Sequence, residues 1–153
     1  MNNGYGVKLE TLFPLIKEKL DMGGSVTFKP NGISMLPLIR QGKDSVMLEK
    51  LCQKAAVGDV IFYQRPDGQF VLHRIVGEDK NGYILCGDNQ YVKEYGVLAD
   101  WIIGIMTKLF RDGQEIDLTD TRYIRYVKRL RYRRTSLKFK NGIAKVRKKI
   151  FMK

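Results

Sequence analysis

The sequence predicts a mainly β protein, with an antiparallel, barrel-like body between an N-terminal helix and a basic C-terminal helical tail. Three observations predict this fold class. Apolar side chains near the N-terminus recur at helical spacing. The middle of the chain carries short runs of β-forming residues between turn signals. The last part, residues 121–153, is rich in Lys and Arg with apolar residues between them.

The N-terminal helix is expected over residues 7–22. It is indicated by apolar residues that share one face at spacings of three and four: Leu9, Leu12, Ile16 and Leu20. Pro14 falls inside this run, so we expect the helix either to start near Phe13 or to kink. Two glycines, Gly23 and Gly24, are expected to end it.

The body is expected to consist of short strands separated by turns. These strands are predicted at residues 25–29, 44–48, 59–63, 70–76, 83–86, 101–110 and 115–118. Pro66-Asp67-Gly68 is expected to join two of them as a hairpin. The even spacing of the runs favours an antiparallel barrel-like body over an alternating α/β fold. A chain of 153 residues suits one such domain, which we place at residues 1–120 with the helix included.

The tail, residues 121–153, carries the net charge of the chain. It holds 14 Lys or Arg residues and no acidic residue, whereas the other 120 residues hold 28 − 14 = 14 basic and 16 acidic side chains, a balance of −2. Thr119 or Asp120 is expected to cap a helix here, and Asn141-Gly142 to break it. Four interpretations fit such a tail. It contacts an anionic membrane surface, or it is a solvated, partly disordered tail whose few apolar residues dock on the body. Contact with nucleic acid or with an acidic leader peptide ranks behind these two.

Composition argues against several classes of protein. No apolar run reaches the length of about 18 residues that predicts a transmembrane helix, and Glu10 and Glu18 do not fit a secretory signal peptide. Cys52 and Cys86 are too few for a disulfide framework, and one histidine without a CxxC motif leaves no zinc site of the usual kind. We therefore expect free thiols, no metal and no cofactor. The expected location is the cytoplasm, with the membrane surface as an option through the tail.

A serine in a tight turn raises the question of nucleophilic chemistry. Ser34 lies in the stretch Asn31-Gly-Ile-Ser-Met-Leu-Pro37, directly after a predicted strand. A nucleophilic serine needs a base within hydrogen-bond reach, and the only imidazole in the chain belongs to His73. Strand alternation places His73 on one face with Val71 and Ile75. Partial burial between them favours the neutral imidazole, which suits a general base.

Two acidic residues are candidates to orient His73. Asp88 lies in the turn Cys86-Gly-Asp-Asn89 after a predicted strand, and Glu94 lies six residues later. Residue pattern alone leaves both open. The turn of Gly32, Ser34 and Met35 is expected to aim backbone N–H groups at a developing oxyanion, with the N–H of Ser34 as the first donor and the second undetermined.

Four segments together resemble the motif set of type I signal peptidases, a superfamily that includes the self-cleaving LexA-type repressor domains. In chain order they are Gly32-Ile-Ser-Met-Leu-Pro37, Val57-Gly-Asp-Val-Ile-Phe-Tyr63, Leu72-His-Arg-Ile-Val76 and Cys86-Gly-Asp-Asn89. The similar region runs from about Thr27 to Met106, roughly half of the chain. The resemblance implies a mainly β serine-peptidase fold with Ser34 as nucleophile.

The resemblance also assigns the base and the acids. Bacterial members generally carry a lysine where this chain has His73, and the endoplasmic-reticulum, archaeal and sporulation-type members carry histidine there. Asp88 matches the family's Gly-Asp-Asn aspartate, and Glu94 stands where the family has a second aspartate. Gly32 replaces a serine that donates to the oxyanion in some members, and Gly42-Lys-Asp replaces a direct Gly-Asp pair. We also expect no membrane anchor, unlike in signal peptidases.

The function predicted from these features is that of a serine endopeptidase that cleaves a precursor, leader or signal-type peptide. The alternative is a non-catalytic module that binds a peptide and is tethered to an anionic membrane or to nucleic acid by its tail. A self-cleaving regulator is a third option, disfavoured because no helix-turn-helix is indicated ahead of the body.

Overall fold

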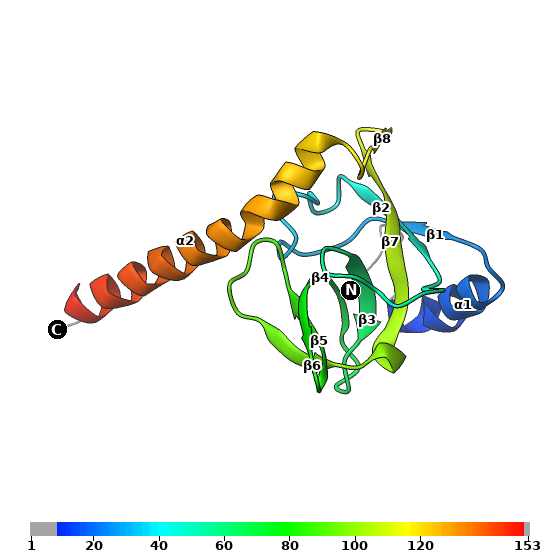
Figure 1. The fold of residues 1–153 in the computed structure, drawn as a ribbon, viewed down its shortest axis with the longest axis horizontal. Helices are drawn as coiled ribbons and strands as arrows, with labels where there is room; N and C mark the ends of the chain where they lie inside the picture. The colour runs from blue at the N-terminus through cyan, green and yellow to red at the C-terminus, as the bar shows by residue number, and fades with distance from the viewer. Residues whose placement is uncertain (1–8, 152–153) are drawn as a thin grey trace.

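The computed structural model describes the backbone of residues 9–151 and the side chains of residues 11–141. Its body is an eight-stranded antiparallel sheet, with one helix before it and one after it (Figure 1). The expected mainly antiparallel β body between two helices is therefore confirmed. The elements are α1 (Leu9–Asp21), β1 (Val26–Phe28), β2 (Ser45–Glu49), β3 (Val60–Gln64), β4 (Phe70–Asp79), β5 (Gly82–Cys86), β6 (Glu94–Val97), the 3₁₀ turn η1 (Ala99–Trp101), β7 (Ile102–Arg111), β8 (Gln114–Ile116) and α2 (Thr121–Phe151).

The sheet does not close into a barrel over the described residues. Its strand order is β1-β2-β7-β3-β4-β5-β6, so β1 and β6 are the edge strands of this path, and β8 pairs with β7 alone. The long strand β7 pairs with β3 through its first half and with β2 through its second half. The predicted hairpin of β3 and β4 is confirmed, and its register places Ile61 opposite His73.

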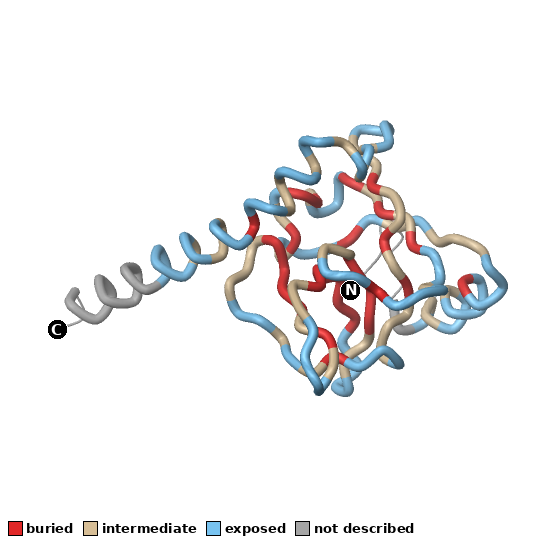
Figure 2. Tube along the Cα trace, in the orientation of Figure 1, coloured by how far each residue is buried: buried red, intermediate tan, exposed pale blue. Residues whose placement is uncertain are grey.

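The two faces of the central strands bury separate hydrophobic clusters. Leu72 packs in one cluster, while Ile61, Val71 and Ile75 pack in the other, as the alternation of a pleated strand requires. Because both faces are covered, β3 and most of β4 are buried along their length (Figure 2). His73 shares the face of Val71 and Ile75, as predicted, but at 6% exposure it is more deeply buried than expected.

Helix α1 covers the Leu72 cluster with Leu20. The helix ends as the two glycines predict: Gly23, at a φ of 79°, donates to the carbonyl of Leu20 at 3.0 Å, and Gly24 donates to the carbonyl of Lys19 at 2.9 Å. Pro14 lies inside α1, so of the two expected alternatives the start near Phe13 is wrong. The hydrogen bond that the proline removes is the one to the carbonyl of Glu10, in the first turn of the helix.

Strand β6 was missed by the sequence analysis. Only Val97 is buried among its four residues, and it includes a glycine and a glutamate, so no apolar alternation marks it. Pairing with β5 forms this strand instead, with Val97 opposite Tyr83 and Glu94 opposite Leu85. The pairing fixes the position of Glu94 at the end of the sheet.

Helix α2 packs on the body over much of its described length. Residues 122–140 include seven that are not exposed, at spacings of three and four: Tyr123, Tyr126, Val127, Leu130, Arg133, Arg134 and Leu137. Leu130 is only 1% exposed, and Tyr123 and Tyr126 pack against the Leu72 cluster. Farther along, the helix extends away from the body (Figure 1). The boundary expected after residue 120 therefore marks a change in amino-acid composition, but residues of α2 beyond it pack against the body.

The helix break expected at Asn141-Gly142 is wrong, because α2 continues to Phe151. A glycine inside a helix costs only about 1 kcal/mol relative to alanine, and the Lys and Arg residues around it are good helix formers. Among the described helices, none is both long enough and apolar enough to cross a bilayer.

We expect Leu130→Ala to lower the free energy of unfolding by about 2–4 kcal/mol, because it opens a cavity where α2 meets the body. Ile124, on the same helix, is 43% exposed, so Ile124→Ala is the matched control. It should change the free energy of unfolding by less than about 0.5 kcal/mol. Urea denaturation of the full chain measures both. Equal and small effects would show that α2 does not belong to the folded body.

Candidate functional site

Buried residues that follow Ser34 hold its turn on the hydrophobic core. Met35, Leu38 and Ile39 are buried in the Leu72 cluster, while Ile33 is exposed and Ser34 is half-buried. The side chains that follow the serine therefore hold the turn on the core and leave residues 33 and 34 at the surface. Met35 thus has a packing role in addition to the oxyanion role expected for its turn.

Backbone N–H groups of this turn remain available for a ligand. The N–H of Leu36 donates to the carbonyl of Ile33 at 3.3 Å, and the N–H of Ile39 donates to the carbonyl of Met35 at 3.0 Å. Those of Ser34 and Met35 have no acceptor among the described residues. Gly32, at a φ of 102° with open space around it, adopts a conformation that other residues rarely reach. Two neighbouring N–H groups of this turn are thus without an acceptor among the described residues, and an oxyanion site needs such donors.

The loop after β5 is fastened to the Ser34 turn. The N–H of Asn89 donates to the carbonyl of Ser34 at 2.8 Å, and Asn89 Nδ2 donates to the carbonyl of Ile33 at 3.2 Å. A Cβ at Gly87 would lie 2.6 Å from the carbonyl oxygen of Ser34, so only glycine fits there. The first and last of the four motifs are therefore in direct contact.

His73 lies on β4 beside this loop. The β4–β5 ladder places Arg74 opposite Cys86, and the next step of the same register would bring His73 opposite Gly87. An open cavity of about 340 Å³ lies at the imidazole. It is lined by Arg65, His73, residues 89–94 and Asn141 of α2. Through Asn89, the cavity adjoins the turn of Ser34.

The imidazole of His73 is neutral at physiological pH. Burial lowers its pKa to about 4, and the nearby guanidinium of Arg65 lowers it further, against the smaller opposite influence of Glu94 and Asp88. Nδ1 of His73 is buried without a hydrogen-bond partner among the described residues. A neutral imidazole can accept a proton, but general-base catalysis is most efficient when the pKa lies near the working pH, so a pKa of about 4 makes this imidazole a weak base.

Glu94 faces the same cavity and is held by two side chains of β3 and the turn after it. Tyr63 donates its hydroxyl to Glu94 Oε2 at 2.7 Å, and Arg65 forms an ion pair with the same oxygen at 2.6 Å. Burial would raise the pKa of Glu94, but these hydrogen bonds outweigh burial and leave it below its ordinary value. The ring of Tyr63 lies 6.4 Å from that of His73. Glu94 is thus an ionised carboxylate close to the imidazole, without a direct hydrogen bond to it among the described residues.

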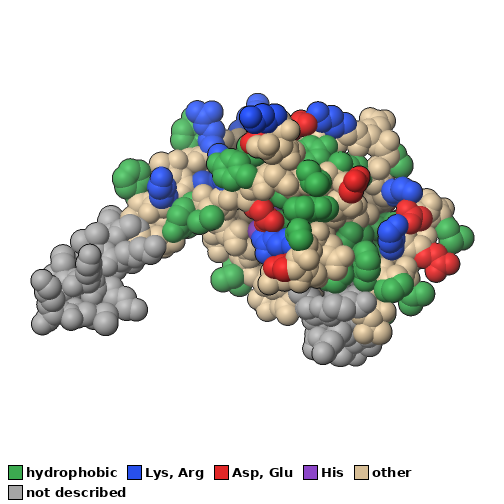
Figure 3. All heavy atoms as spheres, turned by 90° about the horizontal axis from the view of Figure 1, so that it is seen from below, with side chains coloured by type: hydrophobic (Ala, Val, Ile, Leu, Met, Phe, Trp, Pro, Cys, Tyr) green, Lys and Arg blue, Asp and Glu red, His purple; other side chains and the backbone are tan. Residues whose placement is uncertain are grey.

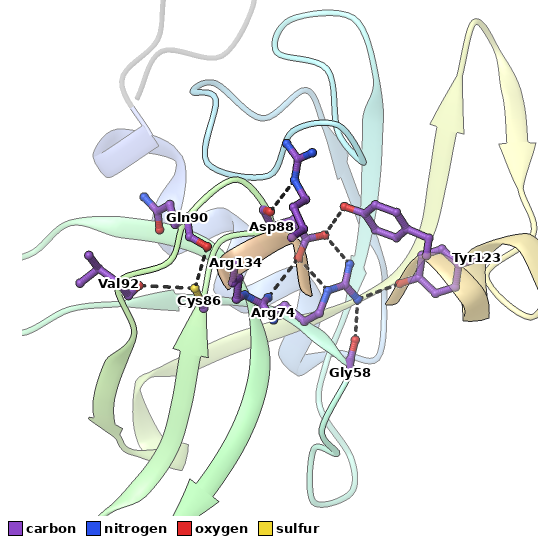
Figure 4. A network of polar contacts seen from close by, with 10 residues as sticks. Gly58, Arg74, Cys86, Asp88, Gln90, Val92, Tyr123 and Arg134 are labelled. Carbon is purple, nitrogen blue, oxygen red and sulfur yellow. Dashed lines mark hydrogen bonds and ion pairs between the residues drawn. The ribbon is translucent and has the colours of Figure 1, made fainter. Parts of the chain in front are cut away.

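Asp88 is engaged away from His73. Its carboxylate binds Arg74 through two hydrogen bonds, from Nε at 2.9 Å and from Nη2 at 2.7 Å, and accepts a third from the hydroxyl of Tyr126 at 2.9 Å (Figure 4). Arg74 follows His73 in the strand and therefore points to the opposite face of the sheet. Of the two acids expected to orient His73, Glu94 is the one that lines its cavity.

Helix α2 completes the site from the side of Asp88. Arg133 donates from Nε to the backbone carbonyl of Asp88 at 3.3 Å and from Nη2 to Asn89 Oδ1 at 3.0 Å. Tyr123 accepts a hydrogen bond from Arg74 Nη1 at 3.0 Å. Sequence reasoning missed the contribution of these tail residues. The available signal was the recurrence of tyrosine and arginine on one face of the predicted helix.

Arg65 and Tyr63 were also missed as partners of Glu94. Tyr63 shares the face of Ile61 on β3, the residue opposite His73, so strand alternation could have placed it beside the histidine. Arg65 lies beyond the strand end, where alternation gives no guidance. Among the described residues, no cluster of His, Cys, Asp and Glu side chains is arranged to hold a metal ion.

Comparison of the chain with family models, with curated proteins and with solved structures found no match.

We expect the buried neutral histidine to make stability depend on pH. The unfolded chain takes up a proton at a pKa of about 6.5, while folded His73 does so only at about 4. As pH falls from 6.5 to 4, the native state should lose up to about 3 kcal/mol relative to the unfolded state, and above 6.5 this loss should vanish.

The measurement is the difference in unfolding free energy between the wild type and His73→Gln at several pH values, so that the carboxylates common to both proteins cancel. As the pH is lowered from 6.5 to 4, the difference should decrease by up to about 1.4 kcal/mol per pH unit. A difference that stays constant from pH 7 to 4 would contradict a buried neutral imidazole.

Proposed function

We propose that the protein is a serine endopeptidase, of the signal-peptidase-like kind that its motifs resemble, and that it cleaves a precursor, leader or signal-type peptide. One observation carries the proposal: Asn89 lines the cavity at His73 and also binds the backbone of the Ser34 turn. Asn89 thereby links the cavity of the proposed base to the turn of the proposed nucleophile, and a serine peptidase needs these two groups within reach of each other.

In this mechanism Ser34 Oγ attacks the scissile carbonyl carbon while His73 takes the hydroxyl proton. The resulting oxyanion accepts hydrogen bonds from the N–H groups of Ser34 and Met35. Collapse of the tetrahedral intermediate breaks the C–N bond, and His73 delivers its proton to the leaving amine. Water, deprotonated by the same imidazole, then releases the acyl group from Ser34. The ionised Glu94 stabilises the imidazolium that forms in each half-reaction.

The free edge of β6 supplies a place for the substrate backbone. β6 is an edge strand, at the end of the strand order of the described sheet, and its first residue, Glu94, lines the cavity. An extended peptide that pairs with such an edge gains main-chain hydrogen bonds, and only the residues next to the cut then need to fit the cavity. The resemblance implies small side chains at that position.

A non-catalytic peptide-binding module is the rival function. It is favoured by the hydrogen bonds of Glu94, whose carboxylate is already bound by Tyr63 and Arg65 and does not bond to His73 among the described residues. In such a module the cavity and the β6 edge would hold a peptide without cleaving it.

Cleavage of a proteome-derived peptide library, read by mass spectrometry, separates the two functions. We expect the wild type to produce new peptide termini, and Ser34→Ala and His73→Ala each to lower the rate by at least about 10³-fold. Ser136→Ala, an exposed serine on α2, is the matched control and should cleave normally. Binding without cleavage by the wild type, or undiminished cleavage by Ser34→Ala, would refute the peptidase.

The pH dependence of cleavage should follow His73. Because the base loses activity only when protonated, kcat/KM should be constant at neutral pH and fall below about pH 5, near the pKa of about 4. A rate that still rises between pH 7 and 9 would instead indicate a different base.

The two acids should respond differently to substitution. Glu94→Gln should lower kcat by about 10–100-fold with little change in stability, because it removes the charge beside the imidazole. Asp88→Asn should lower the free energy of unfolding by about 3–5 kcal/mol, because it leaves the charge of Arg74 buried and unpaired. Peptide cleavage and urea denaturation of both variants test this division, and the reverse pattern would assign the orienting role to Asp88.

A further inference from the structure

Helix α2 has two faces of opposite character. The face described above packs on the body and centres on Leu130 and Leu137. At about 100° per residue, the opposite face carries Ile124, Tyr132 and Phe139 within an arc of about 80°. These three are 43%, 66% and 69% exposed. They form a row of large apolar side chains that nothing in the described chain covers, which we call the apolar row.

Basic side chains flank the apolar row on both sides. Arg125 and Arg129 lie on one side, Arg131 and Lys138 on the other, and all four are exposed. Two polar residues, Lys128 and Thr135, are also exposed and share the arc of the row, with Lys128 between Ile124 and Tyr132. The guanidinium of Arg131 lies 4.9 Å from the centre of the Tyr132 ring. Figure 3 shows hydrophobic and basic side chains interspersed along this part of the helix. No acidic residue follows Asp120 in the sequence, so the helix surface has a single sign of charge.

We propose that the apolar row and its basic flanks form a docking surface for an anionic lipid bilayer. At 1.5 Å per residue, the row extends about 22 Å parallel to the helix axis. Because its three side chains share an arc of about 80°, they can reach one flat surface together. The apolar side chains enter the boundary between headgroups and acyl chains, while Lys and Arg bind lipid phosphates. This association is in the plane of the membrane surface and does not span it.

The apolar row distinguishes a bilayer from nucleic acid as the partner. Both carry phosphates that attract Lys and Arg, so charge alone fits either. Unpaired bases offer stacking surfaces to Tyr132 and Phe139 but not to Ile124, whereas the boundary between headgroups and acyl chains accommodates all three side chains in one plane. Alignment of an aliphatic with two aromatic side chains on the exposed face therefore favours lipid.

Docking through this face would fix the position of the cavity at His73. Asn141, which lines that cavity, lies on the body-facing side of α2, opposite the apolar row. The cavity would then stand about one helix diameter, 10–12 Å, above the membrane surface. This geometry suits a peptide presented at the membrane, and that consequence alone depends on the peptidase function.

The test is co-sedimentation of the full chain with vesicles of phosphatidylglycerol and phosphatidylcholine in equal parts, at physiological salt. We expect binding to these vesicles and at least tenfold weaker binding to phosphatidylcholine alone. The variant Ile124→Ser/Tyr132→Ser/Phe139→Ser should lose at least tenfold in partition coefficient on the anionic vesicles. Circular dichroism establishes that each variant keeps its helices.

The matched control is Leu15→Ser/Met22→Ser/Val57→Ser, which removes three exposed apolar side chains from the body and should bind as the wild type does. Three outcomes overturn the proposal: no binding to anionic vesicles, full binding by the α2 triple variant, or an equal loss in the control. Tighter binding to single-stranded DNA than to vesicles, lost in the α2 triple variant, would also overturn it and assign the surface to nucleic acid. These results concern adsorption only, so they stand apart from any loss of cleavage in Ser34→Ala.

Discussion

The buried ion pair of Arg74 and Asp88 is the constraint on which the rest of the structure depends. Their side chains are 2% and 0% exposed, so each charge is tolerable in the interior only because the other is there. Arg74 belongs to the strand that carries His73, and Asp88 belongs to the loop that binds the Ser34 turn. Tyr126 and Arg133 bring α2 to the same point. Strand, loop and helix are therefore joined by one pair of charges.

The two acidic residues near His73 lie in different surroundings as a consequence. Asp88, bonded to Arg74 on one face of the sheet, organises the framework. Glu94, on the other face, is held by Tyr63 and Arg65 beside a histidine that burial keeps neutral. Burial is the main cause of the low pKa of His73; Arg65 lowers that pKa further, while Glu94, which Arg65 binds, raises it by less.

Sequence reasoning recovered what depends on local pattern. Period-two alternation placed His73 with Val71 and Ile75, and two glycines marked the end of α1, because these features follow from backbone geometry. It missed β6, which forms only by pairing with β5, and it broke α2 at Gly142, where the penalty of one glycine is smaller than the helical preference around it. It did not decide between Glu94 and Asp88 as the acid beside His73, since only the folded sheet shows on which face each carboxylate lies. The predicted barrel is an open sheet in the structure. Closure depends on pairing between strands at distant edges, which local sequence pattern does not reveal.

The most direct measurement of the central claim is a structure of the protein with a peptide boronate that carries a small side chain beside the boron. The account predicts a tetrahedral boron bonded to Ser34 Oγ, with one of its hydroxyl groups facing the N–H groups of Ser34 and Met35 and another within hydrogen-bond distance of His73. A boronate that binds the cavity while Ser34 Oγ remains unbonded and turned away from His73 would contradict it.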